Sequence, residues 1–280
     1  MARLPGGVRA VVGPPVRRVR RELQWLRPEF RLAVGPADAF PHDVAQHATP
    51  LIRELAGLDP QLQHNKVVNL RLAAARLDGL VLRPGQRLSF WRQVGAPTRR
   101  RGFVDGLVLR QGELGAGVGG GMCQFTNLLF WLTLHTPLTV VERWRHSYDV
   151  FPDAGRAQPF GSGATCAWPG LDLQVVNRTG VAFRLGARVG DIDLEGAWTA
   201  DVPVVVRYEV YEVDHRIAED APGAAARCGA GRWTVPGGGR CRGGGRRRAG
   251  RHERGAGDVP ARGALTTGEP GCMRRLLAAA

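Results

Sequence analysis

Apolar side chains at helical spacing predict a buried helix near the middle of the chain. Four of them recur at positions i, i+3, i+4 and i+7: Phe125, Leu128, Leu129 and Leu132. This spacing places them on one face of a helix that begins near Met122. Pro137 ends the helix at or before Thr136, because proline lacks an N–H donor and disfavours helical geometry at the residue before it.

A second helix is predicted from Asn65, whose side chain can cap the first turn. Its apolar positions also recur at helical spacing: Val68, Leu72, Ala75 and the nearby Leu77. Gly79 follows these positions, and glycine is a common residue just beyond the end of a helix. The helix is therefore expected to end before Gly79.

Short apolar runs between turn residues predict strands over most of the remaining middle region. These runs cover residues 87–91, 104–110, 139–143, 171–176, 181–189, 192–198 and 202–213. Tight turns between them, such as 83–86 and 177–180, favour an antiparallel meander. The expected fold is α+β, with a helical N-terminal region, a glycine-rich loop that leads into the buried helix, an antiparallel β-rich C-terminal half and a disordered basic tail.

Composition divides the chain into three parts. Residues 1–63 are punctuated by Arg and Pro and are predicted to form a helical or irregular extension, and residues 64–220 are predicted to form the core domain. Residues 221–280 contain 15 Gly and five residues of the Leu, Ile, Val and Phe set. Because so few apolar side chains cannot build a core, this tail is predicted to be disordered. An out-of-frame extension is one interpretation of it.

The net charge of +14 is concentrated in that tail. Residues 221–280 hold 12 Arg and three acidic residues, whereas residues 64–220 hold 18 basic and 16 acidic residues. The core domain is therefore almost neutral, and no specific nucleic-acid partner is expected for it. Nucleic-acid binding by the tail remains an alternative, which would show a steep dependence on salt.

Membrane, export and metal signals are weak. The chain has no run of 18 apolar residues, so no transmembrane helix is predicted. The apolar run at 10–12 is too short for a signal peptide, which favours a cytoplasmic location. The cysteines form no C-x-x-C pair, so no metal site or cofactor is predicted. Cys123 and Cys166 lie outside the tail, and nothing in the sequence indicates whether they meet.

The chemistry of the chain centres on Cys123, in the first turn of the predicted helix at Met122. Helix N-termini lower the pKa of a thiol, because unpaired N–H groups and the helix dipole favour the thiolate. Backbone N–H groups of the preceding glycines, together with that of Cys123, could hold an oxyanion. This loop set comprises Gly119, Gly120, Gly121 and the side chain of Gln124. The arrangement predicts a cysteine nucleophile, while a small core residue is the alternative.

A general base and further polar contacts complete this hypothesis. His146 follows the strand predicted at 139–143 and is the best candidate to take the thiol proton. A carboxylate would orient its ring, and Asp149, Asp153 and Asp172 are candidates among which the sequence does not choose. Asn65 and Asn69 lie four residues apart on one helical face. They could contact substrate amides, although capping and buried hydrogen bonding are the more common uses of such residues.

Several short motifs together resemble the VanW family, named from the vancomycin B-type resistance proteins. They are residues 64–70, Pro84-Gly85, residues 88–91, Val94-Gly95, Thr98, Gly102-Phe103, the Gly-Gly-Gly-Met-Cys-Gln element at 119–124, Glu142-Arg143, His146-Ser147, residues 161–165 and Asp172-Leu173. The resemblance covers roughly residues 10–217, and the element at 119–124 with its flanks is the specific part.

The resemblance implies a role in glycopeptide resistance and peptidoglycan metabolism at the cell envelope. Some VanW-domain proteins are linked to L,D-transpeptidation, with the cysteine of the glycine-rich loop as nucleophile. Carried over, this implies that Cys123 attacks the carbonyl of a peptidoglycan stem peptide or precursor and that His146 takes its proton. The alternative is a non-catalytic accessory or binding protein of the same system, which would use the same groove without turnover.

Overall fold

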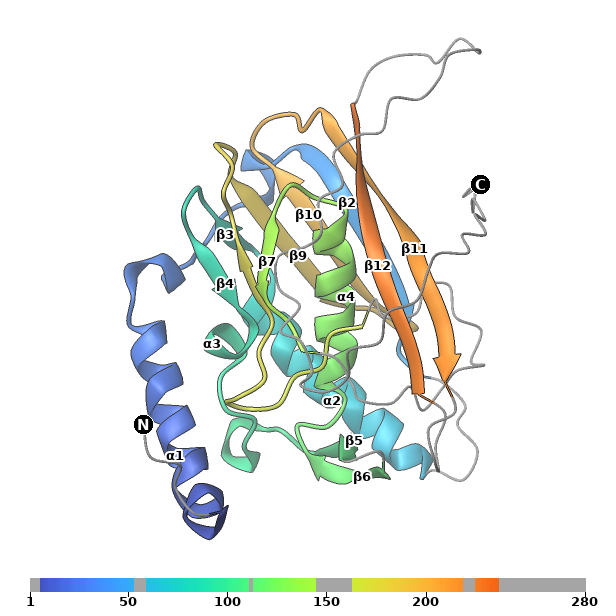
Figure 1. Cartoon of the computed structure of the whole chain (residues 1–280). Helices are drawn as coiled ribbons and strands as arrows, with labels where there is room; N and C mark the ends of the chain where they lie inside the picture. Colours follow the sequence, from blue (N-terminus) through green and yellow to red (C-terminus); the bar gives the residue numbers. More distant parts are fainter. Residues whose placement is uncertain (1–5, 53–58, 111–112, 145–162, 219–224, 237–280) are drawn as a thin grey trace.

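The computed structural model describes residues 6–52, 59–110, 113–144, 163–218 and 225–236, and it confirms a mixed α+β fold. The α-helices in these ranges are α1 (Gly6–Trp25), α2 (Pro60–Leu77), α3 (Phe90–Val94) and α4 (Met122–Leu134). Single-turn 3-10 helices occur at Pro28–Phe30, Ala37–Ala39 and Arg99–Arg101. In Figure 1, α2 and α4 lie beside the largest sheet and α1 lies at the edge of the molecule.

The largest sheet has five antiparallel strands in the order β1-β3-β9-β10-β2. Their bounds are Ala33–Val34 for β1, His42–Pro50 for β2, Leu80–Leu82 for β3, Phe183–Val189 for β9 and Asp193–Ala200 for β10. Leu185 of β9 pairs with Trp198 of β10, so both side chains point to the same face. Both are completely buried beneath the helices, because α2 packs on β9 and α4 packs on β10 and β2.

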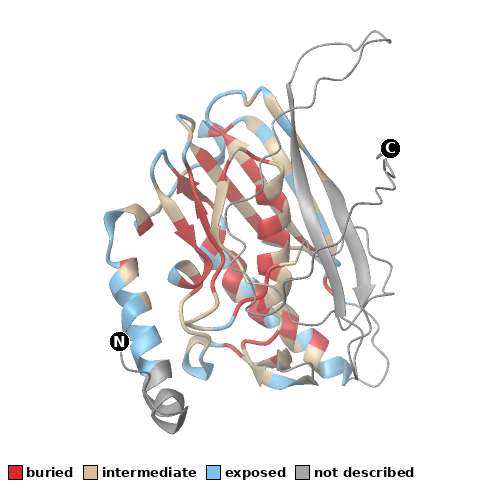
Figure 2. Cartoon of the chain, viewed as in Figure 1, coloured by how far each residue is buried: buried red, intermediate tan, exposed pale blue. Residues whose placement is uncertain are grey.

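Three smaller β units surround this core. One is a three-stranded sheet in the order β4-β8-β7, and the others are the hairpins β5-β6 and β11-β12. Their bounds are Arg87–Ser89 for β4, Asp105–Arg110 for β5, Glu113–Val118 for β6, Thr139–Glu142 for β7, Gln174–Val176 for β8, Val206–Ala218 for β11 and Ala225–Pro236 for β12. Figure 2 shows the buried residues concentrated where α2, α4 and the two larger sheets meet.

The structure departs from the sequence predictions at several helix and strand ends. Asp59, not Asn65, caps α2: its carboxylate accepts a hydrogen bond of 2.9 Å from the N–H of Gln61. The strand predicted at 87–91 ends at Ser89, whose hydroxyl caps the short helix α3. The glycine-rich stretch before the buried helix, predicted to be a loop, contains strand β6, because its backbone pairs with β5 from Asp105 to Arg110. A meander describes β9 and β10, but β8 pairs with β4 and β7.

The two flanking regions also contain regular structure that the sequence analysis does not predict. Within 1–63, β1 and β2 are strands of the main sheet, so this region is not simply an extension of the core. Within the tail, Ala225–Pro236 forms strand β12. Although β12 has few apolar residues, its backbone pairs with that of β11 in an antiparallel ladder. Residues 237–280 lie outside the described residues, and the three domain boundaries remain predictions.

None of the helices in the described ranges is both long and apolar enough to span a bilayer.

Candidate active site around Cys123

Cys123 lies in the first turn of α4, directly after a glycine turn. Gly121 is the N-cap residue, with φ of 94° and ψ of −7°, a left-handed conformation that glycine adopts without steric cost. The side chain of Cys123 is half-buried and packs against the edge of the hydrophobic core. The predicted placement of the thiol at a helix start is therefore confirmed.

A segment from elsewhere in the chain lies against this turn and contacts the thiol. The Sγ of Cys123 lies 3.4 Å from the Oγ1 of Thr165 and 3.7 Å from the carbonyl oxygen of Cys166. Two side chains of α4 hold the segment in place. Thr126 donates a hydrogen bond of 2.6 Å to the carbonyl of Ala164. The N–H of Ala164 donates one of 2.6 Å to the side-chain oxygen of Asn127. Cys123, Thr126 and Asn127 share one face of the helix, so α4 fixes what lies beside its own thiol.

The glycine loop before Cys123 is tightly packed, and its first two N–H groups are already used. The N–H of Gly119 donates to the carbonyl of Val104 at 3.0 Å, and that of Gly120 donates to Gly117 at 2.9 Å. These two groups are therefore unavailable as oxyanion donors, which corrects part of the sequence prediction. Gly120 lies back to back with Gly106, where any Cβ would collide with the backbone. Close packing is thus one reason for glycine at this position.

The amide of Gln124 anchors the start of α4 to β2. Its Nε2 donates to the Oγ1 of Thr49 at 3.2 Å and to the carbonyl of Pro50 at 2.8 Å. Both amide hydrogens are therefore engaged with β2, so the predicted role of Gln124 as an oxyanion donor is not supported by this geometry.

Asn65 and Asn69 connect α2 to the hairpin that carries the loop. Asn65 donates to the carbonyl of Asp105 at 2.7 Å. Asn69 is completely buried, donates to the carbonyls of Val104 and Gly120 and accepts from the N–H of Val104. These bonds use both amide hydrogens of Asn69 and its oxygen, which supports the interpretation of buried hydrogen bonding over substrate contact.

Asp172 is completely buried and holds other polar groups together. Its Oδ2 accepts hydrogen bonds from Ser89 at 2.5 Å and Gln174 at 3.1 Å, and its Oδ1 accepts one from the N–H of Trp91 at 3.0 Å. Ser89 in turn accepts a hydrogen bond of 2.9 Å from the indole of Trp25 in α1. Burial raises the pKa of Asp172 to about 6, against the lowering effect of the bonds from Ser89 and Trp91.

Stability should depend on pH through Asp172. Its pKa is about 6 in the folded chain and near 3.9 in an unfolded one. Between these pH values the folded state binds more protons, so the contribution of Asp172 to the free energy of unfolding falls by about 3 kcal/mol as pH rises. Urea unfolding at pH 4 and pH 7 should show about 2 kcal/mol of this fall in the wild type relative to Asp172→Asn. Equal pH dependence in the two proteins would contradict the assignment.

A second part of this network joins α1 to β7. The guanidinium of Arg21 makes two hydrogen bonds to Glu142, at 2.7 and 2.6 Å, with both side chains mostly buried. It also donates to the carbonyls of Pro169 and Gly170 at 3.2 and 3.0 Å. Glu142 additionally accepts from the N–H of Asp172 at 3.3 Å. The N-terminal helix is thus bound to the same polar cluster as Asp172.

Three predicted site residues lie outside the described ranges: His146, Asp149 and Asp153. Their roles as general base and orienting carboxylates remain predictions. Asp172 is described, but its carboxylate accepts hydrogen bonds from Ser89, Trp91 and Gln174, so these bonds give no support to its role as a ring-orienting group. In the described part of the chain, no three His, Cys, Asp or Glu side chains are grouped so that they could hold a metal ion.

Two residues near the thiol were missed as individual candidates. Thr165 falls within the family motif at 161–165, so the motif pointed to its neighbourhood but not to its contact with Cys123. Lys66 is buried, donates to Gln63 at 2.7 Å and lays its aliphatic stem against Gly121. A charged residue within a predicted helix is usually expected on its exposed face. The sequence alone therefore does not indicate that Lys66 packs against Gly121.

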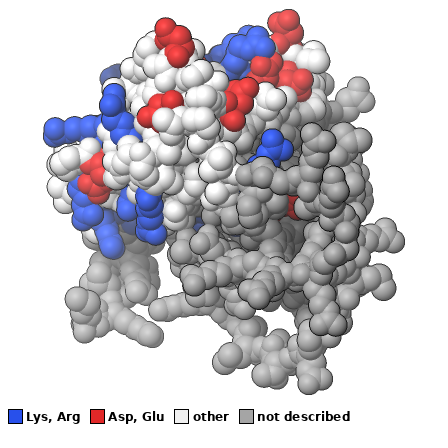
Figure 3. All heavy atoms as spheres, turned by 90° about the horizontal axis from the view of Figure 1, so that it is seen from above, with Lys and Arg blue, Asp and Glu red and all other residues white. Residues whose placement is uncertain are grey.

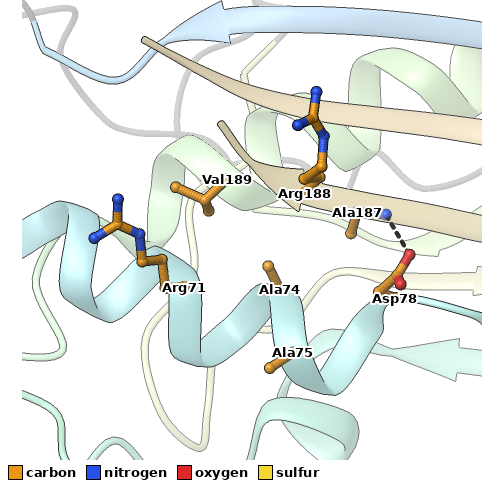
Figure 4. A pocket seen from close by; sticks show the side chains of 7 residues that line it. All are labelled: Arg71, Ala74, Ala75, Asp78, Ala187, Arg188 and Val189. Carbon is orange, nitrogen blue, oxygen red and sulfur yellow. Dashed lines mark hydrogen bonds between the residues drawn. The ribbon is translucent and has the colours of Figure 1, made fainter. Parts of the chain in front are cut away.

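The surface offers little support for a second site. A shallow hollow lies between α2 and β9, where the carboxylate of Asp78 accepts a hydrogen bond of 3.0 Å from the N–H of Ala187 (Figure 4). Its lining includes none of the candidate residues. On the face shown in Figure 3, described basic side chains are interspersed with acidic ones. This distribution agrees with the balanced charge counted over residues 64–220.

Comparison with known proteins bears on the region that contains the site. A family model described as "VanW like protein" matches residues 65–199, which include most of α2, the glycine loop, Cys123, Thr165 and most of the β9-β10 hairpin. Through these residues the chain belongs to the VanW family. This confirms the resemblance inferred from the motifs. The VanW region includes Asn65, Asn69, Asp172 and the whole set of loop residues.

Two curated relatives share parts of the chain. The chain is 39% identical over 154 residues to the vancomycin B-type resistance protein VanW of Enterococcus faecalis, covering 55% of this chain and 56% of that protein. It is 34% identical over 110 residues to the uncharacterized protein YoaR of Bacillus subtilis, covering 39% of this chain and 35% of that protein. The chain thus spans about half or less of the length of these relatives. No solved structure matches it.

Proposed function

We propose that the chain is a cysteine-dependent acyl-transfer protein of cell-wall metabolism, with Cys123 as its nucleophile. The observation that carries the proposal is the position of the half-buried thiol in the first turn of α4, 3.4 Å from the hydroxyl of Thr165. Helix starts favour the thiolate, the form of cysteine that attacks carbonyl groups. The relative named as a vancomycin resistance protein supports peptidoglycan stem peptides as substrates and a place at the cell envelope.

In this mechanism the Cys123 sulfur attacks a stem-peptide carbonyl while His146 takes the thiol proton. The amide C–N bond at that carbonyl breaks, its amine leaves with the proton from His146, and the acyl group stays on Cys123 as a thioester. An amine from a second stem then attacks the thioester, which forms a new amide bond and releases the thiol. Because Gly119 and Gly120 use their N–H groups inside the loop, the oxyanion role passes to the N–H groups at the start of α4, chiefly those of Gly121 and Cys123. Thr165 adds a hydroxyl next to the sulfur.

Replacing the nucleophile tests this proposal directly. Cys123→Ala should abolish labelling by an electrophilic thiol probe at that position and reduce the formation of 3-3 stem cross-links at least about 100-fold. The matched control is Cys166→Ala, which removes a neighbouring buried thiol and should leave labelling at Cys123. Mass spectrometry of tryptic peptides locates the label. Cross-linking that continues unchanged in Cys123→Ala would overturn the proposal.

The second candidate is a non-catalytic protein that binds the same peptides. The hydrogen bonds of the loop favour this candidate. The N–H groups of Gly119 and Gly120 and the amide of Gln124 donate to other atoms of the protein and not to a site for an oxyanion. If the protein only binds, Cys123→Ala should bind a stem peptide with the same Kd as the wild type. Neither protein should convert the peptide. Calorimetry and product analysis on one pair of proteins therefore separate the two candidates.

A further inference from the structure

The fold brings together two cysteines that are 43 residues apart in the sequence. Cys123 begins α4, while Cys166 belongs to the segment held against α4 by Thr126 and Asn127. The Cys123 sulfur lies 3.7 Å from the backbone carbonyl oxygen of Cys166. The Cys123 thiol also acts on the Cys166 thiol, whose pKa it helps to raise. In the structure both are thiols.

The contact geometry suits formation of a covalent bond. A disulfide needs its two sulfurs about 2.05 Å apart and the two Cβ atoms about 3.5–4.5 Å apart. The Cys166 backbone is already within contact distance of the Cys123 sulfur, at 3.7 Å from sulfur to carbonyl oxygen. The bonds of Ala164 to α4 keep this segment beside the Cys123 thiol, and the pairing proposed below requires the two cysteine side chains to rotate toward each other.

The two thiols differ in the way that a sensing and a resolving cysteine differ. Cys123 is half-buried at a helix start, whereas Cys166 is 9% exposed and packed in the core. Burial raises the pKa of Cys166, so this thiol stays protonated near neutral pH. Oxidants therefore reach Cys123 first, and Cys166 is placed to react with the oxidised product.

We propose that Cys123 and Cys166 form a reversible disulfide when the protein meets a hydroperoxide, and that this bond blocks the Cys123 sulfur. In the first step, the Cys123 thiol and hydrogen peroxide give a sulfenic acid and one water. In the second, the Cys166 thiol attacks the sulfenic sulfur, which forms the S–S bond and releases a second water. Two thiols are oxidised by two electrons in total, and one peroxide is reduced. A dithiol reductant reverses the bond by thiol exchange.

The pairing stands on the geometry alone, but its effect as a switch rests on the proposed function of Cys123. Formation of the disulfide would remove the only sulfur to which that function assigns the attack. The switch would therefore turn acyl transfer off under oxidising conditions and restore it after reduction.

Peptide mapping of the full-length protein tests the pairing. Trypsin places Cys123 in peptide 111–143 and Cys166 in peptide 157–178, and each peptide contains a single cysteine. After treatment with stoichiometric hydrogen peroxide, alkylation and digestion without reductant, we expect these two peptides to be joined, and dithiothreitol to separate them. In Cys166→Ser the joined species should be absent, Cys123 should remain a sulfenic acid, and a second equivalent of peroxide should convert it to sulfinic acid. Cys228, Cys241 and Cys272 serve as competing thiols in the same sample.

Two results would overturn the pairing: peptides 111–143 and 157–178 that are recovered separately after oxidation, or Cys123 joined predominantly to one of the three competing cysteines. Labelling of the reduced protein by the electrophilic probe is measured in parallel. If the two peptides are joined but the reduced protein shows neither probe labelling nor cross-linking activity, the proposed function is wrong and the disulfide is still supported. If the protein is active but the peptides are not joined, the disulfide is wrong and the proposed function is still supported.

Discussion

Arg21→Ala should lower the free energy of unfolding by about 3 kcal/mol. The guanidinium makes two hydrogen bonds to Glu142 and two to backbone carbonyls, in a site where both charged side chains are less than one fifth exposed. Removing one member of a buried ion pair leaves the other charge uncompensated, which is costly in a poorly solvated site. The neighbouring acid Asp172 should respond as well, because Arg21 lowers its pKa and the loss of Arg21 would raise it further.

The matched control lies one turn earlier on the same helix. Arg18 pairs with Glu22 at 2.8 Å, but its side chain is 61% exposed. Because solvent screens such a pair, Arg18→Ala should cost no more than about 0.5 kcal/mol. Urea unfolding of the two variants checks the difference. Equal losses in both variants would show that α1 is not held by the Arg21–Glu142 pair.

Gly120→Ala should also destabilise the protein by about 3 kcal/mol. The new Cβ would lie inside contact distance of the backbone of Gly106, and a backbone cannot move aside as a flexible side chain can. The carbonyl of Gly120 also accepts a hydrogen bond of 2.9 Å from the buried Asn69, so a shift of the loop would disturb that residue. Thermal unfolding measures the loss, and thiol labelling reports whether Cys123 has moved.

Gly115→Ala provides the comparison. Gly115 belongs to strand β6 of the same hairpin, and no atom lies within 4 Å of a Cβ built there. Its replacement should change the free energy of unfolding by less than about 0.5 kcal/mol. If Gly120→Ala were tolerated as well as Gly115→Ala, close backbone packing would not be the reason for glycine at 120.

Elements with a strong apolar period could be predicted from the sequence. Helix α4 follows from the spacing of Phe125, Leu128 and Leu129, and strands β9 and β10 follow from apolar runs between turns. Strand β2 could not be predicted, because polar and aromatic side chains make part of its contact with α4: Gln124 binds Thr49, and His47 packs on Trp131. Its sequence therefore lacks the apolar alternation typical of a half-buried strand.

The candidate site was predictable where a local pattern determines it and unpredictable where distant segments meet. The glycine loop and the position of Cys123 at a helix start are local, and both were predicted. The contact between Cys123 and Thr165 depends on the hydrogen bonds that hold Ala164 to α4. Likewise, the buried network around Asp172 depends on Ser89, on Trp91 and, through Ser89, on helix α1, all of which are distant in sequence.

Strand β2 completes the main sheet from outside the segment matched by the family model. It pairs with β10 along its length, from His42 to Pro50, and occupies the edge of the sheet. A fragment trimmed to residues 65–199 would therefore present the bare backbone of β10, an open edge that invites aggregation. Shortened versions of this protein therefore need to begin before residue 42. They then keep β2, whose backbone pairs with the edge of β10.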